Sequence, residues 1–293
     1  MILSVNQVHK SYGKEKILTG ISFEINEPNI IALIGPNGSG KSTLLSIITN
    51  LVATDQGEVM ILNKSNKDPN IFREIAFMQD NSVLYDYLTG YDHLQFIGDI
   101  QNITKEEIYE AVERIGMTSY LHKKVGKYSL GMKQHLLLTM AILNKPKLLL
   151  LDEPLNGLDP TSAIKVRNLL LALLQEGTAI IISSHNLSEI DLITRHIIFL
   201  KDGKIIKENI PQNERVYYEL TVDDYIKAQE IILAEKISVK LEGEKLLLQN
   251  TSTYLSEIIR LLSKEEVNIQ DIEKKTLGSE DRYQKIFGQK GHA

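Results

Sequence analysis

Apolar and polar positions alternate in blocks over the first two thirds of the chain, and these blocks predict strands and helices in turn. Alternation over 2–8 and 17–25 predicts two strands, and the apolar run 30–34 predicts a third that is buried on both faces. The same patterns predict strands at 57–62, 75–78, 147–151 and 179–184, and helices at 41–50, 132–144 and 161–176. Because apolar strands alternate with helices, we expect an α/β fold with a mixed, largely parallel sheet covered on both faces.

The segment from about 84 to 135 has the period of helices. Within it, the amphipathic run ITKEEIYEAVERIG has Thr104 near its start and Gly116 at its end. Threonine is a good helix N-cap and glycine a good C-cap, so we expect a helix between these two residues. The segment is therefore predicted to be a helical subdomain inserted into the α/β domain.

The pattern changes at the Ile-Pro-Gln-Asn sequence, 210–213. Beyond it the pattern predicts strands at 216–222, 237–241, 245–249 and 267–274, helices at 224–236 and 253–265, and a helical tail. That β-α-β-β-α-β order is typical of a small ferredoxin-like domain. We therefore expect two domains, 1–209 and an accessory α+β domain at 210–293. A length of 293 residues at roughly 150 per domain agrees with this division.

Composition excludes several classes of protein. With 33 Lys and Arg against 38 Asp and Glu, the net charge is −5, which does not favour nucleic acid as a partner. The chain has no cysteine, so disulfides, cysteine-bound zinc, iron–sulfur clusters and a thiol nucleophile are excluded. No apolar run approaches the ~20 residues of a membrane helix, and the first residues do not resemble a signal peptide. We therefore expect a soluble intracellular protein.

A glycine-rich segment between the apolar strand at 30–34 and the helix from Lys41 matches the pattern G-x-x-x-x-G-K-[ST]. Its glycines allow backbone N–H groups to converge on phosphate oxygens, and the helix dipole adds positive charge. Lys41 is expected to reach the β- and γ-phosphates and Ser42 to bind Mg²⁺. A glycine-rich turn without function is the alternative, which the flanking strand and helix disfavour. The predicted phosphate-binding residues are Gly35, Pro36, Asn37, Gly38, Ser39, Gly40, Lys41, Ser42 and Thr43.

Two carboxylates follow the four leucines at 148–151. Asp152 is predicted to end a strand at the sheet edge where α/β proteins bind ligands, and to hold Mg²⁺ through water. Glu153 is placed to accept a proton from an attacking water. A solvated acidic turn after a buried strand is the alternative, and the phosphate loop elsewhere in the chain favours the functional interpretation.

In this order the residues resemble the ATP-binding subunits of ABC transporters, over 1 to about 209. The resemblance continues at five further landmarks. Gln79 resembles the glutamine that senses Mg²⁺ and faces the membrane partner, and the segment 128–134 resembles the signature sequence L-S-G-G-Q. Asp159, in Asn-Gly-Leu-Asp, resembles the end of the loop that crosses the dimer interface. His185 resembles the switch histidine at the γ-phosphate, and Tyr12 the aromatic residue that stacks on adenine.

The signature departs from the family pattern. Tyr128, Leu130 and Met132 replace Leu, Gly and Gln, whereas Ser129 and Gly131 remain. In the family, the two retained residues approach the γ-phosphate of the ATP held by the partner subunit.

The residue after Gln134 is His135, where many relatives have arginine. The form Y-S-L-G-M-K, a chain near 300 residues and an acidic C-terminal extension resemble the bacitracin- and lantibiotic-exporter branch.

The resemblance implies an ATPase in which Lys41, Glu153 and His185 carry out catalysis with ATP and Mg²⁺ as cofactors. The implied metal-binding residues are Ser42, Gln79 and Asp152.

The resemblance also implies partners. We expect an ATPase dimer, homomeric or heteromeric, and a separate transmembrane permease that holds the subunit on the inner face of the cell membrane. Export of a peptide antibiotic is the expected task, with import left open.

Two alternatives remain. A soluble ABC-type ATPase acting on DNA or the ribosome would carry a coiled-coil insertion, zinc cysteines or two cassettes, and this sequence has none of them. A regulatory module with little turnover is disfavoured by Glu153.

Overall fold

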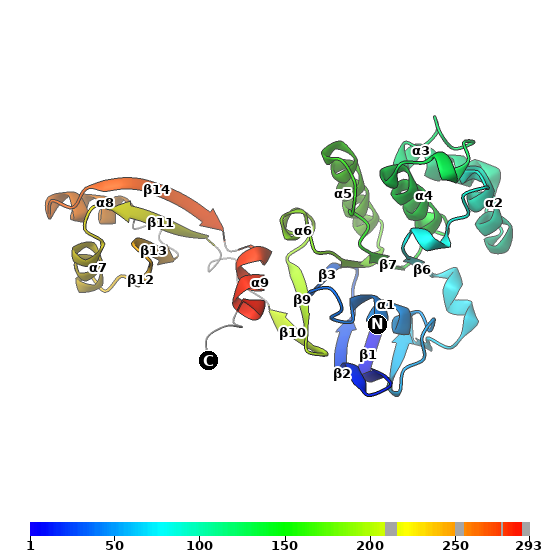
Figure 1. Ribbon diagram of the computed structural model, residues 1–293, viewed down its shortest axis with the longest axis horizontal. Coiled ribbons are helices and arrows are strands. Elements are labelled where there is room, and N and C mark those ends of the chain that lie inside the picture. The colour runs from blue at the N-terminus through cyan, green and yellow to red at the C-terminus, as the bar shows by residue number, and fades with distance from the viewer. Residues whose placement is uncertain (209–215, 250–254, 277, 289–293) are drawn as a thin grey trace. The chain divides into compact units, whose positions relative to one another are not determined.

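The computed structural model describes residues 1–208, 216–249, 255–276 and 278–288 (Figure 1). The chain divides into two compact units, Met1–Glu208 and Asn209–Ala293, each with its own hydrophobic core. The change of pattern predicted at 210–213 and the first residues of the helix predicted at 253–265 lie outside the described residues.

An antiparallel sheet of four strands, in the order β2-β1-β4-β5, forms one layer of the first unit. Its strands are β1 (Leu3–Tyr12), β2 (Glu15–Ile25), β4 (Gln56–Ile61) and β5 (Lys64–Ser65). These four strands form a sheet of their own beside the largely parallel one. Only Gly13 and Lys14 separate β1 from β2, and so short a connection forces an antiparallel hairpin.

A sheet of six strands, in the order β10-β9-β3-β8-β7-β6, forms the second layer. It contains β3 (Ile30–Ile34), β6 (Ile75–Met78), β7 (Leu148–Asp152), β8 (Ala179–Ser183), β9 (His196–Lys201) and β10 (Lys204–Glu208). All pairs are parallel except the β9–β10 hairpin, which turns at Asp202 and Gly203 with φ of 50° and 71°. The predicted parallel sheet is thus confirmed.

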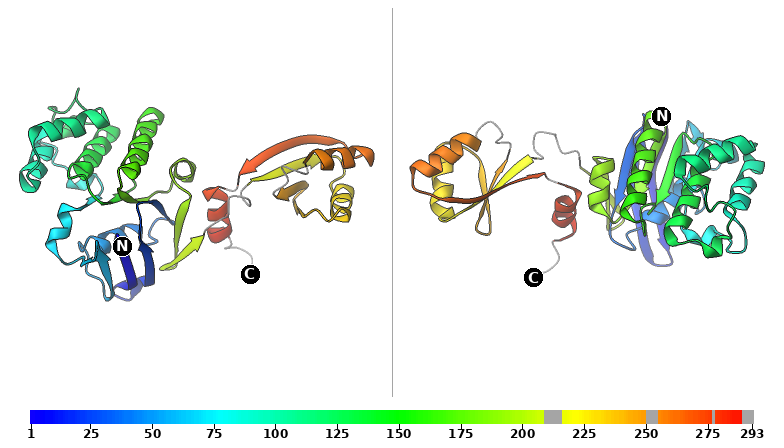
Figure 2. Two further views of the ribbon diagram at one scale, coloured as in Figure 1. Left: turned by 180° about the vertical axis from the view of Figure 1, so that it is seen from behind. Right: turned by 90° about the horizontal axis from the view of Figure 1, so that it is seen from above.

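Helices cover both faces of the parallel sheet. Helix α1 (Lys41–Ile48) lies between the two sheets, whereas α5 (Pro160–Gln175) and α6 (Leu187–Ile193) lie on the opposite face (Figures 1 and 2). The pattern did not predict α6, because seven residues are too few to show a helical period. None of the described helices is long and apolar enough to cross a membrane.

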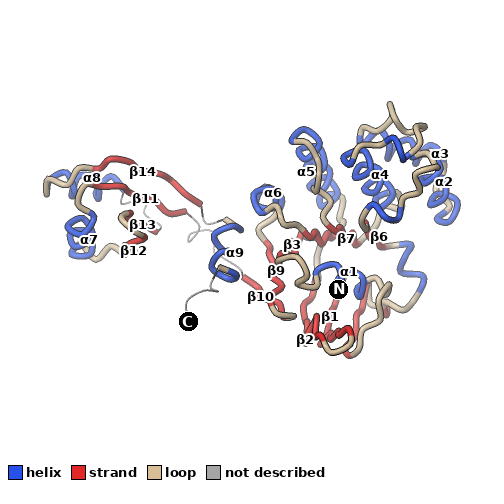
Figure 3. Tube along the Cα trace, in the orientation of Figure 1, coloured by secondary structure: helices blue, strands red, loops and turns tan. Residues whose placement is uncertain are grey.

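The remaining helices of this unit lie beyond the β6 edge, as the blue segments of Figure 3 show. They are α2 (Gly90–Gln101), α3 (Lys105–Ile115) and α4 (Leu130–Ile142), with short 3₁₀ turns at Pro69–Arg73, Asn81–Val83 and Val125–Lys127. Thr104 caps α3 by accepting a hydrogen bond from the N–H of Glu107, and Gly116 ends it with φ of 85°, as predicted.

The second unit has the predicted β-α-β-β-α-β order, followed by one more helix. Its elements are β11 (Val216–Val222), α7 (Tyr225–Ala234), β12 (Val239–Glu242), β13 (Lys245–Gln249), α8 (Leu255–Lys264), β14 (Ile269–Thr276) and α9 (Ser279–Phe287). The antiparallel strand order is β12-β13-β11-β14, so the two central strands come from different halves of the unit. Leu220, Leu246 and Leu248 are fully buried in a core shared with α7 and α8.

Candidate functional site

Loops at one edge of the parallel sheet carry most of the predicted site residues. Strands β3, β8, β7 and β6 are neighbours and run in the same direction, so their carboxyl ends meet at that edge. The glycine-rich loop follows β3 and Gln79 follows β6, while Asp152 ends β7 and His185 comes shortly after β8. This is the edge at which parallel sheets bind ligands.

Glycines let the loop after β3 run close to its neighbours. A Cβ atom on Gly35 would lie 2.6 Å from the backbone oxygen of Leu200 in β9, and one on Gly40 would lie 2.8 Å from Cγ2 of Ile17. Gly38 and Gly40 also have φ of +78° and +99°, which other residues rarely adopt. The loop backbone therefore packs so closely against its neighbours that side chains at Gly35 and Gly40 would not fit.

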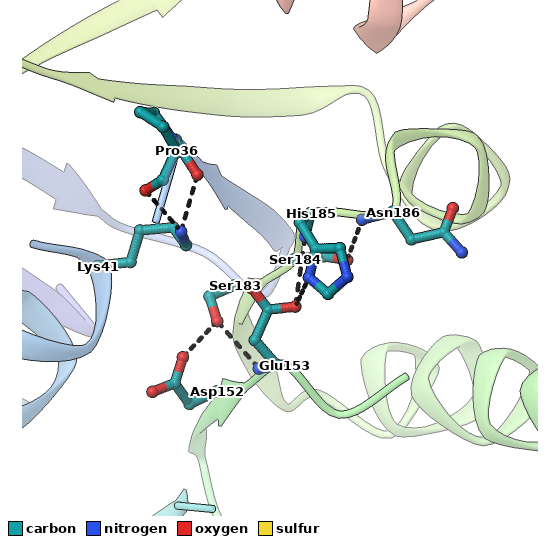
Figure 4. Close-up of polar contacts among 9 residues, drawn as sticks. Pro36, Lys41, Asp152, Glu153, Ser183, Ser184, His185 and Asn186 are labelled. Atoms are coloured by element: carbon teal, nitrogen blue, oxygen red, sulfur yellow. Dashed lines mark hydrogen bonds and ion pairs between the residues drawn. The ribbon is translucent and has the colours of Figure 1, made fainter. Parts of the chain in front are cut away.

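Lys41 turns back into this loop and is almost completely buried. Its Nζ donates hydrogen bonds to the backbone oxygens of Gly35 (2.7 Å) and Pro36 (3.2 Å), as Figure 4 shows. Burial lowers the pKa of Lys41, and the negative charges of Glu153 and Asp152 oppose that shift. A phosphate in the loop would offer the ammonium a stronger, charged acceptor than the two carbonyls.

The donors around the loop fit a phosphate ligand. Helix α1 begins at Gly40 without a side-chain cap, so its first N–H groups have no side-chain acceptor. Among the described residues, the buried hydroxyl of Ser39 has no hydrogen-bond partner. Ser42 is exposed and Thr43 half-buried in the first turn of α1. These groups have the chemistry needed to hold the phosphates of ATP.

The two carboxylates after β7 are held by residues of and after β8. Asp152 Oδ1 accepts a hydrogen bond from Ser183 Oγ (2.6 Å), and the same Oγ accepts one from the N–H of Glu153 (3.0 Å). Glu153 Oε2 lies 2.8 Å from His185 Nδ1 and also accepts from the His185 N–H (3.3 Å). The structure thus brings together both carboxylates and the histidine predicted from separate motifs.

Oxygen atoms at the sheet edge fit a magnesium ion. Asp152, Ser42 and Gln79 supply carboxylate, hydroxyl and amide oxygens, the ligand type that Mg²⁺ prefers. Within the described ranges, no group of three or more His, Asp or Glu side chains could hold a metal by itself. In phosphoryl-transfer proteins, one or two carboxylates share Mg²⁺ with the substrate phosphates.

The signature segment contacts a different part of the same chain. Ser129 caps α4 by accepting from the N–H of Met132 (3.3 Å), and no hydrogen bond in the described structure joins Ser129 or Gly131 to the phosphate loop. A Cβ on Gly131 would lie 3.6 Å from Leu158 Cδ2, an ordinary contact, whereas one on Gly157 would overlap Leu130 Cδ2. The signature and the loop at 156–158 therefore pack together within one subunit.

Tyr128, the residue that departs first from the family signature, is buried in the helical part. Its hydroxyl donates to the backbone oxygen of Tyr120 (2.7 Å), and the two rings meet edge to face at 5.3 Å. The Tyr120 hydroxyl in turn lies 2.8 Å from Nδ1 of His135 on α4. Burial raises the pKa of both tyrosines to about 12. Sequence reasoning missed this network, although the exchanged residues Tyr128 and His135 were a signal for it.

Asp159 and Tyr12 lie on the surface. Asp159 caps α5 by accepting from the N–H groups of Thr161 (2.9 Å) and Ser162 (3.1 Å), and hydrogen bonds from Ser162 and Thr161 lower its pKa. The Tyr12 ring is half exposed at the end of β1, with Lys10 Nζ 5.4 Å from its centre. In the described structure, neither residue is hydrogen-bonded to Asp152 or Glu153.

Some known proteins resemble part of this chain and others resemble nearly its full length. Residues 18–156 match the ABC transporter family. The ABC transporter ATP-binding protein YhcH of Bacillus subtilis (strain 168) is 34% identical over 98% of this chain and 96% of its own length. The bacitracin transport ATP-binding protein BcrA of Enterococcus faecalis is 29% identical over 100% of this chain and 98% of its own length. A solved dimeric structure of the ATP-binding cassette MJ0796 in a post-hydrolysis state, bound to ADP and Pi, is 26% identical with a TM-score of 0.66, covering 71% of this chain and 98% of that one.

Proposed function

This chain belongs to the ABC transporter family as an ATP-binding, ATP-hydrolysing subunit, and from that premise we propose that it drives a separate membrane permease that exports a peptide antibiotic. The proposal is supported by one observation above all, that the Lys41 loop lies at the same sheet edge as Asp152, Glu153 and His185. The chain also matches a bacitracin transport protein over its whole length.

Lys41 and the loop N–H groups are assigned to phosphate binding. When ATP binds, Lys41 Nζ exchanges the backbone oxygens of Gly35 and Pro36 for phosphate oxygens. Bound through Ser42, Gln79 and Asp152, Mg²⁺ would neutralise charge on the phosphates.

Glu153 is assigned as the base that takes a proton from the attacking water, and His185 as the residue that holds it. The hydrogen bonds from His185 fix Glu153 Oε2 and leave Oε1 to face the water. In this arrangement positioning and charge neutralisation supply most of the catalysis.

A dimer completes the site. In the proposed dimer, Ser129 and Gly131 of one subunit approach the ATP held by Lys41 of the other, and Asp159 lies in the crossing loop. The separation of the signature from the phosphate loop within one chain supports this arrangement.

An exposed apolar surface after Gln79 is the proposed contact with the permease. It consists of Tyr85 and Tyr87, whose ring centres are 5.7 Å apart, with Phe96 and Ile100 one turn apart on α2. All four side chains are more than half exposed. His93 fixes the loop beneath them, because its Nε2 accepts from the Tyr85 N–H (3.0 Å). Four large apolar side chains in one stretch of 16 residues favour a protein partner rather than water.

Co-purification tests the proposal. A tagged full-length chain, captured from detergent-solubilised membranes of its own organism, is expected to bring with it a protein with several membrane-spanning helices. Replacing Phe96 and Ile100 by serine should remove that protein and keep ATP binding. Leu51→Ser, at an equally exposed leucine outside the surface, is the matched control and should retain the partner.

Capture of ribosomes or DNA in place of a membrane protein would refute the permease. Unchanged tolerance to bacitracin and to lantibiotics in cells that carry only the Glu153→Gln form would refute the proposed cargo.

A further inference from the structure

One hydroxyl at the end of β8 bonds to both carboxylate residues of the proposed site. Ser183 is fully buried and paired in register with Asp152 on one side and Leu33 of β3 on the other. Its Oγ donates to Asp152 Oδ1 at 2.6 Å and accepts from the N–H of Glu153 at 3.0 Å (Figure 4). A serine hydroxyl has one hydrogen to donate, and here that hydrogen goes to Asp152.

The bond to the Glu153 N–H acts at a strained residue. Glu153 has φ of 51°, a left-handed conformation that is unfavourable for a residue with a Cβ and persists only where its surroundings fix it. Its N–H is held by the Ser183 Oγ, its carbonyl oxygen accepts from the Asn156 N–H (3.1 Å), and its carboxylate is held by two His185 nitrogens. Without the first, the backbone can relax and carry the carboxylate away.

The bond to Asp152 orients its carboxylate. Oδ1 is occupied by Ser183, and the described structure shows no hydrogen bond to Oδ2. The hydroxyl thus fixes the orientation of the carboxylate and leaves Oδ2 open to a ligand.

The neighbouring serine has a different task, since Ser184 Oγ accepts from the Asn186 N–H (3.0 Å) in the next loop. In the described structure, Ser183 is hydrogen-bonded to the carboxylate residues and Ser184 is not.

We propose that Ser183 is a positioning residue for ATP hydrolysis, which orients the carboxylate of Asp152 and holds the backbone of Glu153 through one hydroxyl. The proposal rests on the roles assigned above to these two carboxylates. Partners of metal ligands typically change metal affinity or activity by about 10- to 100-fold when removed.

Ser183→Ala in the purified full chain is the test. We expect kcat to fall by about 10- to 100-fold with the KM for ATP unchanged. The Mg²⁺ concentration that gives half-maximal tightening of a fluorescent ATP analogue should rise by about tenfold, while binding without Mg²⁺ stays as in the wild type. This binding measurement is independent of turnover. Ser183→Thr keeps the hydroxyl and should recover most of both losses.

Thr178→Ala is the matched control. Thr178 Oγ1 is buried and donates to the backbone oxygen of Pro146 (2.9 Å). This bond joins the segments just before β8 and β7, whereas Ser183 joins the ends of the same two strands. Its removal should lower the melting temperature much as Ser183→Ala does, and leave kcat and the Mg²⁺ midpoint unchanged. An equal loss of kcat in both variants would overturn the proposal, because it would assign the effect to sheet stability.

Asp152→Asn and Glu153→Gln separate failure of this inference from failure of the assigned roles. If both are impaired while Ser183→Ala stays within twofold of the wild type in kcat and Mg²⁺ midpoint, Ser183 is not a positioning residue. If Asp152→Asn and Glu153→Gln behave as the wild type, the site assignment itself is wrong and the proposal falls with it.

Discussion

At the level of single residues, Glu153 combines strain with exposure. Its backbone lies in the left-handed region, and its carboxylate remains one quarter exposed beside His185. A residue held in a costly conformation at a ligand-binding edge is typical of a functional site. This strain at the sheet edge supports the proposed role of Glu153 as the base.

Glu153→Gln should keep ATP binding and lower turnover by at least about 100-fold, because an amide cannot accept the proton of the attacking water. The variant should also accumulate as an ATP-bound dimer. Steady-state hydrolysis and gel filtration with ATP check both results. Glu113→Gln, an exposed carboxylate on α3, should hydrolyse ATP normally. Turnover of Glu153→Gln near the wild-type rate would show that another group is the base.

Local motifs predicted the residues that follow one another in the chain, and missed those that depend on contacts between strands. The loop from Gly35 to Ser42 and the Asp152–Glu153 pair can be recognised from neighbouring residues alone. Ser183 lies 30 residues from Glu153 and becomes important only because β8 pairs with β7. Nothing in a serine at the end of an apolar strand marks such a contact in advance.

At the level of elements, α4 joins the signature to the core of the helical part. Ser129 starts the helix, and His135 is buried on its inner side against Tyr120. Burial lowers the pKa of His135, as does the charge of Lys165, while Asp159 opposes the shift. The two charged residues belong to α5 and its cap, so the state of this histidine depends on both helices.

A lowered pKa makes His135 a pH-dependent stability element. In the unfolded chain His135 takes up a proton near pH 6.5, whereas burial opposes its protonation in the folded chain. The stability that His135 contributes is therefore present above that pH and is lost as the pH falls. Between pH 7.5 and 5.5, the free energy of unfolding should fall by up to about 1.4 kcal/mol more in the wild type than in His135→Gln. Urea unfolding at both pH values measures this difference. His122→Gln, at an exposed histidine, should keep the wild-type slope, and an unchanged slope in His135→Gln would contradict the prediction.

The hydrophobic periodicity of the sequence predicted the strands and most of the helices. Each strand of the parallel sheet is a short apolar run, and each long helix has a solvent-exposed face. The periodicity did not predict that β1, β2 and β4 form a sheet of their own. Strand pairing depends on contacts such as Val5 with Val59, which lie far apart in the sequence. Similar apolar spacing suits either sheet, so the pattern alone could not divide them.

At the level of the whole molecule, the two units have separate cores. The first core draws its residues from Leu3 to Leu200 and the second from Leu220 to Val267, with no buried residue in common. We therefore predict that residues 1–209 fold alone and bind ATP, since every assigned nucleotide contact lies in that part. Circular dichroism and nucleotide titration test this. A folded 1–209 chain that cannot bind ATP would show that the boundary is wrong.

Mixed dimers test the composite site, for a homodimer. Lys41→Ala removes the phosphate contact, and Gly131→Asp places a carboxylate where like charges repel a partner's γ-phosphate. Each should be inactive alone, but a 1:1 heterodimer has one intact site and should recover part of the hydrolysis. Gly131→Ala is the matched control and should stay active, because its Cβ makes only an ordinary contact with Leu158.

A second heterodimer pairs a wild-type chain with a chain that carries both Lys41→Ala and Gly131→Asp. Each of its two shared sites then contains one of the two changes, so it should remain inactive. Activity in that pair and none in the mixed pair would mean that each chain works within its own site.

The overlap between Leu130 and position 157 makes the order of evolutionary substitutions matter. Gly157 has φ of +73° and no room for a Cβ while Leu130 covers it. A lineage with glycine at position 130, as in the common family signature, is free of that overlap. A side chain at 157 therefore meets two obstacles, the left-handed backbone and Leu130, and loss of the leucine removes only the second. A chimera that brings a side chain to position 157 while Leu130 remains is therefore expected to be less stable than one that replaces both residues.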